Sequence, residues 1–126
     1  MATRSHIGKL LPNGSVKYIY CHWDGYPEHN GKILKEHYTD EAKIDALLEL
    51  GDLSSLGEEI GEKQDFNNQD THNSKWCLAY GRDRGENNID ARISPTVSDM
   101  IDQAYHYVWN GASWSCFGYD GRELVF

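Results

Sequence analysis

The amino-acid sequence predicts a single α+β domain over residues 1–126, in which an antiparallel β-sheet built from N- and C-terminal hairpins carries two to three helices on one face. Asn-Gly pairs at 13–14 and 110–111 each separate two strand-like runs, which is typical of tight hairpin turns. Between the hairpins, apolar residues recur at helical spacing. No linker, internal repeat or low-complexity tract divides the chain, so one domain is the simplest organisation.

The N-terminal hairpin is expected to pair residues 5–11 with residues 15–23. Its Asn-Gly turn is favourable because both residues readily adopt positive φ angles. In the second strand, Val16 and Tyr18 lie on one face and Ile19 on the other, so both faces carry apolar surface. This pattern favours a central strand.

Two helices are expected after the first hairpin. Residues 31–38 follow Asn30, whose side chain is a favourable N-cap. Thr39 or Asp40 can cap a second helix. Apolar residues at helical spacing indicate that this helix extends to Gly51. Glycine after the last helical residue is a common helix end.

The middle of the chain is expected to be less regular. Residues 52–57 have the pattern of a capped single turn, and residues 58–74 contain few large apolar side chains, so an irregular acidic loop is predicted there. Residues 76–80 are strand-like. Residues 81–88 are polar and glycine-flanked, which indicates a turn.

A third helix is predicted before the second hairpin. Ser94 is a favourable N-cap, Pro95 suits the first helical position, and apolar residues at helical spacing continue to Tyr105. The remaining expected strands are residues 105–109 and 113–119, which form the C-terminal hairpin, and 123–126, which can add an edge strand.

The formal net charge of −8 is concentrated in residues 36–70, where eleven acidic residues stand against two lysines. Such a surface repels the phosphates of nucleic acids and membranes and attracts basic partners. A merely solvated helical face is the alternative. The candidate partner-binding residues are Glu41, Asp45, Glu49, Glu58, Glu59 and Glu62.

A cluster of metal-ligating and nucleophilic residue types begins at Cys21 and continues through His22, Asp24, His29 and His37. Thiolate, imidazole and carboxylate are the ligands that zinc prefers, and a thiol beside an imidazole can act as a nucleophile. Neighbours on a strand point to opposite faces, however, and no CxxC or HxxxH pair occurs. We therefore expect no metal and no cofactor, and the sequence leaves open whether these side chains converge.

The glycine-flanked turn holds two guanidinium groups, those of Arg82 and Arg84. They could grip a phosphate or a carboxylate in bidentate fashion, with His22, Asp24 and His29 near the ligand and Trp23 as an aromatic contact. The alternative, which we favour, is an internal network of ion pairs that ties the turn to the acidic segment. The sequence lacks the GxSxG, GxxxxGK[ST] and GxGxxG signatures, so no catalytic motif predicts an enzyme.

Apolar runs and cysteine spacing indicate the compartment in which the protein is expected. No apolar run approaches the ~20 residues that cross a bilayer, and no secretory apolar stretch follows Arg4. The cysteines are three and widely spaced, which favours reduced thiols. A soluble cytoplasmic protein is expected, with no membrane contact.

Four strings together resemble a family of small, uncharacterised proteins carried by phages, prophages and plasmids. They are TRSHIG at residues 3–8, YCHWDGYPEHNG at 20–31, LGDLSSLG at 50–57 and YGRDRGE at 80–86. The resemblance spans nearly the whole chain. It implies an accessory protein of a mobile element that acts inside a bacterial host, and it carries over no catalytic residues.

The resulting hypothesis is a non-catalytic acidic binding protein that inhibits a host defence or nucleic-acid-handling complex, as an anti-CRISPR or anti-restriction protein would. Its expected partner is a host protein with a basic groove, without direct binding to nucleic acid. The alternative is a small protein that binds or cleaves a nucleotide or cyclic nucleotide through the Arg82/Arg84 turn and the His22 loop. Aromatic side chains on an edge hairpin would also suit a homodimer.

Overall fold

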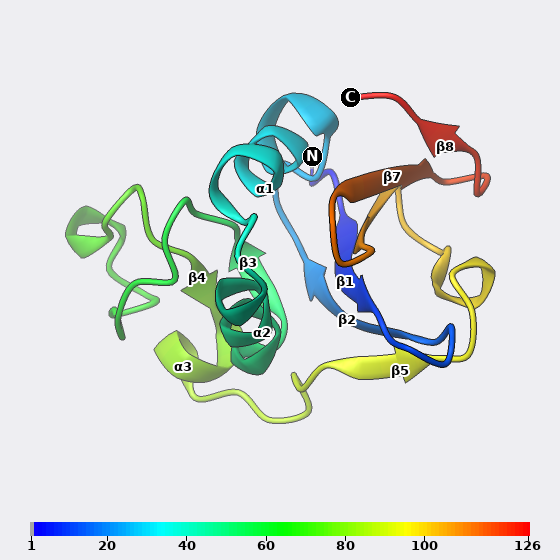
Figure 1. Cartoon of the computed structure of the whole chain (residues 1–126). Helices are drawn as coiled ribbons and strands as arrows, with labels where there is room; N and C mark the ends of the chain where they lie inside the picture. The colour runs from blue at the N-terminus through cyan, green and yellow to red at the C-terminus, as the bar shows by residue number, and fades with distance from the viewer. Residues whose placement is uncertain (1) are drawn as a thin grey trace.

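A mixed eight-stranded sheet organises the chain in the computed structural model, which describes residues 2–126 (Figure 1). The order along the sheet is β4-β3-β2-β1-β6-β7-β8, and β5 pairs with β2 off this path. The strands are β1 (Ser5–Leu10), β2 (Val16–Cys21), β3 (Leu53–Ser55), β4 (Leu78–Ala79), β5 (Arg92–Ser94), β6 (Tyr105–Trp109), β7 (Trp114–Gly118) and β8 (Glu123–Leu124).

Both predicted hairpins are confirmed. β1 pairs antiparallel with β2, and β6 pairs antiparallel with β7. The prediction that β2 is central is also confirmed, because β1 covers one of its edges while β5 and β3 share the other. The apolar side chains of β2 also pack in two separate clusters, Ile19 and Cys21 in the main core and Val16 and Tyr18 in the second.

The expected antiparallel sheet is wrong at two pairings. β1 runs parallel to β6, and β2 runs parallel to β3 at Cys21 and Leu53. The two hairpins thus join through their first strands. A parallel pair needs a long crossover, and the chain between β1 and β6 supplies one that contains the helices.

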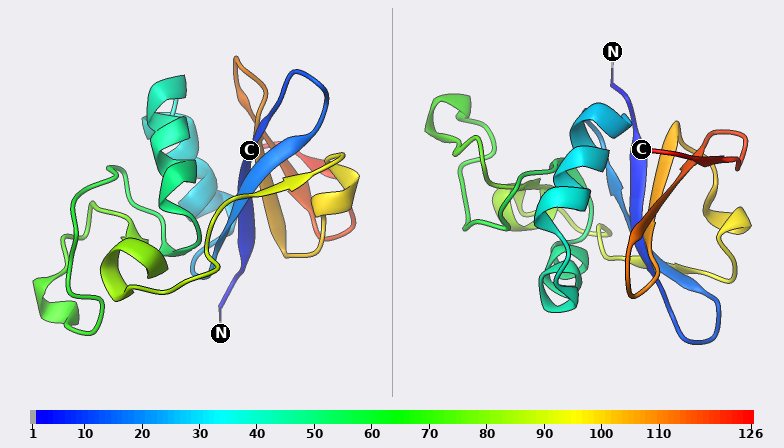
Figure 2. Two further views of the ribbon diagram at one scale, coloured as in Figure 1. Left: turned by 90° about the horizontal axis from the view of Figure 1, so that it is seen from below. Right: turned by 45° about the horizontal axis from the view of Figure 1, so that its top comes forward.

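The helices lie on one side of the sheet, with residues 58–74 beyond them, while the segment between β5 and β6 lies on the other side (Figures 1 and 2). α2 (Glu41–Leu50) forms where it was predicted and ends at Gly51, whose φ is +77°. α1 (Lys32–His37) continues a π-helical turn, η1 (Pro27–Gly31). Asn30 does not cap α1, since it lies within η1 and is buried.

The predicted helix from Ser94 to Tyr105 is wrong. Ser94 ends β5, and the rest forms only a 3₁₀ turn, η3 (Ser98–Met100). The Ser94 hydroxyl donates to the carbonyl of Thr96, 2.9 Å away, rather than capping a helix. Arg92–Ser94 pairs with the edge of β2, so the residue expected to cap the helix is held in an extended strand, which local helical spacing does not reveal.

Three shorter predictions also need correction. Residues 52–57 contain β3 rather than a single turn, and β4 is shorter than the strand expected over 76–80. The polar turn begins with a short helix, α3 (Tyr80–Arg84). Residues 58–74 are irregular as predicted, apart from the 3₁₀ turn η2 (Gln69–Thr71).

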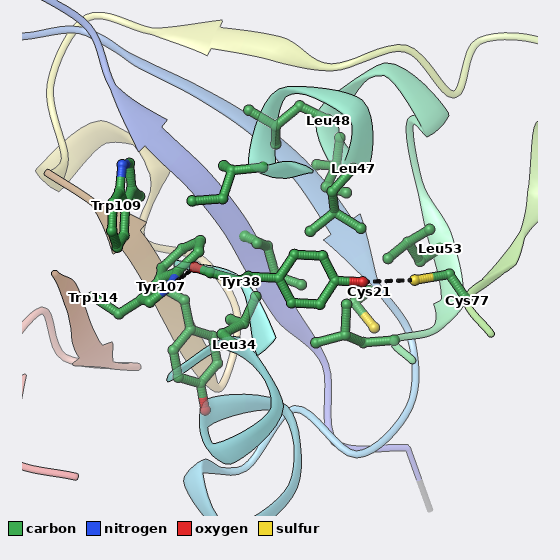
Figure 3. Packing of buried hydrophobic residues seen from close by; sticks show 14 of the residues in the cluster. Cys21, Leu34, Tyr38, Leu47, Leu48, Leu53, Cys77, Tyr107, Trp109 and Trp114 are labelled. Carbon is green, nitrogen blue, oxygen red and sulfur yellow. Dashed lines mark hydrogen bonds between the residues drawn. The ribbon is translucent and has the colours of Figure 1, made fainter. Parts of the chain in front are cut away.

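The main core lies between the sheet and the helix layer (Figure 3). Tyr38, fully buried, lies at its centre and donates its hydroxyl hydrogen to the carbonyl of Gly57 at 2.7 Å. The carbonyl of Tyr38 accepts from the indole of Trp114 at 2.8 Å. This residue therefore joins the end of α1 to the loop after β3 and to β7. Within residues 2–126, no helix has both the length and the apolar character needed to cross a membrane.

Candidate functional site

The acidic side chains of α2 face solvent and form a strip along the helix. Asp45 lies 2.8 Å from the ammonium of Lys9, and Glu41 lies 3.8 Å from the same group. Glu49 lies 3.8 Å from Lys17. The carboxylates remain more than half exposed, so these pairs leave the strip open to a partner.

Lys43, the lysine of α2, is turned toward the interior of the helix layer. Its ammonium donates to the carbonyls of His37 at 2.7 Å and Glu58 at 2.6 Å, and it lies 4.2 Å from the centre of the Tyr38 ring. These contacts dock α2 against the loop after β3. They also bring the acidic strip of α2 next to the acidic residues that begin this loop.

Three acidic residues of that loop extend the surface. Glu58 is half-buried and pairs with the imidazole of His37, 3.0 Å away. Glu59 and Glu62 are exposed, and within residues 2–126 neither has a basic group within 4.0 Å. We call Glu41, Asp45, Glu49, Glu58, Glu59 and Glu62 together the acidic surface.

The segment after β2 is held in a defined conformation by Asn30. Its buried amide donates to the carbonyl of Trp23 at 3.3 Å and to the Cys21 thiol at 3.4 Å. Asp24 adopts a φ of +55°, which is uncommon for a residue other than glycine, and accepts from the Tyr26 hydroxyl at 3.3 Å. Unusual backbone of this kind often marks a functional loop, although it does not define one.

The metal-ligating and nucleophilic side chains that begin at Cys21 do not come together in one site. Cys21 is fully buried, whereas the His22 ring is half-buried, hydrogen-bonded to the hydroxyl of Tyr20 at 2.7 Å and edge-on to Trp23. Trp23 is 43% exposed. Asp24 and His29 line a cleft of 240 Å³, which has His72 in its wall.

A second cleft, of 400 Å³, lies beside the first. His29 lines both, and His37 lines the second together with Glu28, Glu36 and Glu58. The ring of His29 is hydrogen-bonded to the side chain of Asn30 at 3.0 Å. The structure thus brings Asp24 near His29, and His29 near His37, but not around one point.

The three thiols are buried and poorly suited to nucleophilic chemistry. Burial raises the pKa of Cys21 to about 12 and that of Cys116 to about 11. Burial also raises the pKa of Cys77, whose sulfur lies 3.4 Å from the Tyr38 hydroxyl. Because the thiolate is the reactive form, these environments suppress reactivity.

Arg82 directs its guanidinium into the protein. It donates to the carbonyls of Ile60 at 2.8 Å and Cys77 at 2.7 Å, and its Nε donates to Asp83 at 2.9 Å. Asp83 also accepts from the backbone N–H groups of Gln64 and Ala79. Burial alone would raise the pKa of the Asp83 carboxyl, but these hydrogen bonds outweigh it and hold the pKa below its ordinary value of 3.8.

Arg84 is more exposed but also has internal partners. Its Nε donates to Glu86 at 2.6 Å, and its guanidinium carbon lies 4.4 Å from the ring centre of Phe66 and 4.9 Å from that of Tyr80. Neither arginine lines the cleft of Asp24 and His29. This geometry favours the internal network, which ties α3 to the acidic loop, over a phosphate grip.

Sequence reasoning missed a cluster formed by His6, Asp102 and His106. The parallel register of β1 and β6 places His6 beside His106, and ligand atoms of the three residues lie within 4.8 Å of one another. The Nε2 lone pair of His106, which a metal would need, already accepts from two backbone N–H groups. The donor set therefore does not fit a metal. The signal that could have found this cluster is the strand pairing, which is not local in sequence.

No protein-family model, curated protein or solved structure matches this chain.

Proposed function

We propose that this protein is a non-catalytic binding protein of a phage or other mobile element. In this proposal it presents the acidic surface to a basic groove on a host defence or nucleic-acid-handling protein and thereby inhibits it in the bacterial cytoplasm. The resemblance to small mobile-element proteins supports the setting. The charge distribution supports the kind of partner.

One observation carries the proposal: the carboxylates of α2 and those of Glu59 and Glu62 in the loop after β3 are exposed on adjoining elements, while the lysine of α2 is turned inward. Lys43 is held by two backbone carbonyls and the Tyr38 ring. The negative field is therefore not interrupted by an outward-facing lysine on α2. A field of this kind accelerates association with a basic partner and weakens as salt is added.

The contacts of the chemical groups support binding rather than catalysis. The thiols are buried with raised pKa values, and Arg82 donates to three internal acceptors. Nucleophilic catalysis would need a nucleophile beside a base, and a phosphate grip would need an unengaged cation facing a cleft.

The experiment is an affinity purification of the tagged protein from its bacterial host, washed at low and at high salt, with mass spectrometry of the retained proteins. We expect a stoichiometric partner with a basic surface that is lost at high salt. The first variant to compare is Glu59→Lys/Glu62→Lys, because reversing these two charges breaks no ion pair within residues 2–126.

The matched control is Asp90→Lys/Glu123→Lys, which changes the net charge by the same amount with exposed residues outside the acidic surface. Partner recovery should fall at least tenfold with the first variant and little with the control. Equal loss with both variants would indicate a general charge effect, and equal retention by both would contradict the proposal. Circular dichroism checks that both variants remain folded.

A further inference from the structure

His106 is a fully buried imidazole whose two nitrogens have opposite hydrogen-bonding roles. Its Nδ1–H donates to the carbonyl of Phe117 at 3.2 Å. Its Nε2 accepts from the backbone N–H groups of Asp102 at 3.1 Å and Gln103 at 2.9 Å. These partners require the neutral ring with its proton on Nδ1.

His6 holds the same segment from the neighbouring strand. The ring centres of His6 and His106 are 5.5 Å apart, and His6 Nδ1 donates to the carbonyl of Met100 at 3.0 Å. The two imidazoles together thus bind the backbone of residues 100, 102 and 103. Met100 itself is fully buried and packs in a second core cluster with Val16 and Val108, so it anchors the start of the segment.

We propose that His6 and His106 form a pH-sensitive latch, which holds residues 101–104 on the sheet while both rings are neutral and releases them when His106 binds a proton. The proton would occupy Nε2, so an N–H group would then face two backbone N–H groups. The two hydrogen bonds that Nε2 accepts cannot persist, whereas the one from Nδ1–H to Phe117 can, so the two backbone donors must move away or become solvated. The segment can move because β6 begins only at Tyr105.

The surroundings of the latch contain few charges. The Asp102 carboxylate lies 3.6 Å from His6 Nδ1 and favours the protonated rings, whereas Arg92 opposes protonation of His6. The other groups that face the pair are the rings of Tyr18 and Tyr20 against His6, the more distant Asp52, and the carbonyl groups of β7 at Phe117 and Gly118.

Burial dominates this balance. It lowers the pKa of both imidazoles, and a positive charge on His6 would lower the pKa of His106 further. Because the pKa of His106 is lower in the closed state than its ordinary value of 6.5, the closed state is fully stable above pH 6.5. It loses stability as the pH falls below 6.5, since the open state then binds a proton more readily. Opening would also reshape a cleft of 620 Å³, because Asp102, Gln103 and Ala104 form part of its wall.

The test measures hydrogen exchange of the Asp102 and Gln103 amides in the full chain between pH 7.5 and pH 5, as protection relative to intrinsic rates. One proton is bound on opening, so protection of these two amides should fall about tenfold per pH unit below about 6.5. The amides of Ile7 and Tyr107, in the core strands, should keep their protection. The His106→Gln variant can supply an oxygen acceptor without titrating and should abolish the pH dependence.

The control variant is His72→Gln, which removes an imidazole from the loop over 58–74 and should leave the pH profile unchanged. If His106→Gln does not fold, ¹⁵N shifts of the imidazoles in the unaltered protein decide the matter, because titration of His106 Nε2 must coincide with the loss of protection. The latch is refuted if the two amides stay protected to pH 5. It is equally refuted if they open together with the core strands, or if a folded His106→Gln keeps the same pH profile.

Discussion

Replacing Asp83 by alanine should destabilise the fold strongly, because this buried carboxylate is the shared acceptor for α3 and its neighbours. It receives hydrogen bonds from the N–H groups of Gln64 at 2.9 Å and Ala79 at 2.7 Å and from Arg82 at 2.9 Å. Removing one partner of a buried ion pair costs about 3–5 kcal/mol. Arg82 retains two carbonyl acceptors after the change, so we expect the lower end of that range, about 3 kcal/mol.

Urea unfolding followed by circular dichroism measures this change. With a slope of about 1.5 kcal/mol per molar urea, a loss of about 3 kcal/mol moves the midpoint down by about 2 M. Asp83→Asn keeps an oxygen acceptor but loses the charge, so it should cost less, about 1–2 kcal/mol. The exposed control Asp90→Ala should change the stability by less than about 0.5 kcal/mol.

The stability that Asp83 contributes should also depend on pH. The pKa of Asp83 is lowered in the folded protein, so its contribution is complete above the ordinary value of 3.8 and is lost as the pH falls through the lowered value. The difference between the wild type and Asp83→Ala should therefore shrink only in strong acid. An Asp83→Ala variant as stable as Asp90→Ala would refute the structural role of this network. Arg82 would then again be a candidate for binding a phosphate.

Two further predictions follow from backbone and thiol environments. Gly51→Ala should cost about 2–4 kcal/mol, since φ is +77° and the added Cβ would lie 2.2 Å from the carbonyl oxygen of Ile89. Gly111→Ala, with φ at +99° but nothing within 4 Å of its Cβ, should cost only about 1–2 kcal/mol, and equal effects in thermal unfolding would contradict the close packing at Gly51. All three thiols are buried, and burial raises the pKa of Cys21 to about 12. They should therefore resist a thiol-specific reagent at pH 8 until denaturant exposes them. Fast labelling of the native protein would contradict this prediction.

Much of the local structure could be predicted from the sequence, because its causes lie within a few residues. The Asn-Gly pairs determine where both hairpins turn, and the apolar stripe before Gly51 determines α2. The segregation of acidic residues into 36–70 is likewise a property of the sequence. Its presentation on α2 and the adjoining loop follows once an apolar stripe directs the opposite face inward.

The candidate roles of individual polar residues depended on distant partners. The sequence alone left Arg82 between a phosphate grip and an internal network. The carbonyl of Ile60, 22 residues away, and that of Cys77, five residues away, both accept from Arg82 and favour the network. The segment after Ser94 carries helical spacing, but Ser94, its expected N-cap, is held in the sheet because Arg92–Ser94 pairs with the edge of β2. Burial and edge pairing outweigh local propensity at such positions.

The parallel pairing of β1 with β6 is the clearest feature that only the tertiary structure decided. It joins hairpins from opposite ends of the chain and places His6 beside His106, which no spacing in the sequence indicates. The two hairpin turns and α2 arise from bonds within a few residues, and the sequence by itself determined them. Strand order, strand direction and the partners of buried polar groups arise from hydrogen bonds and burial between residues far apart, so only the folded chain could decide them.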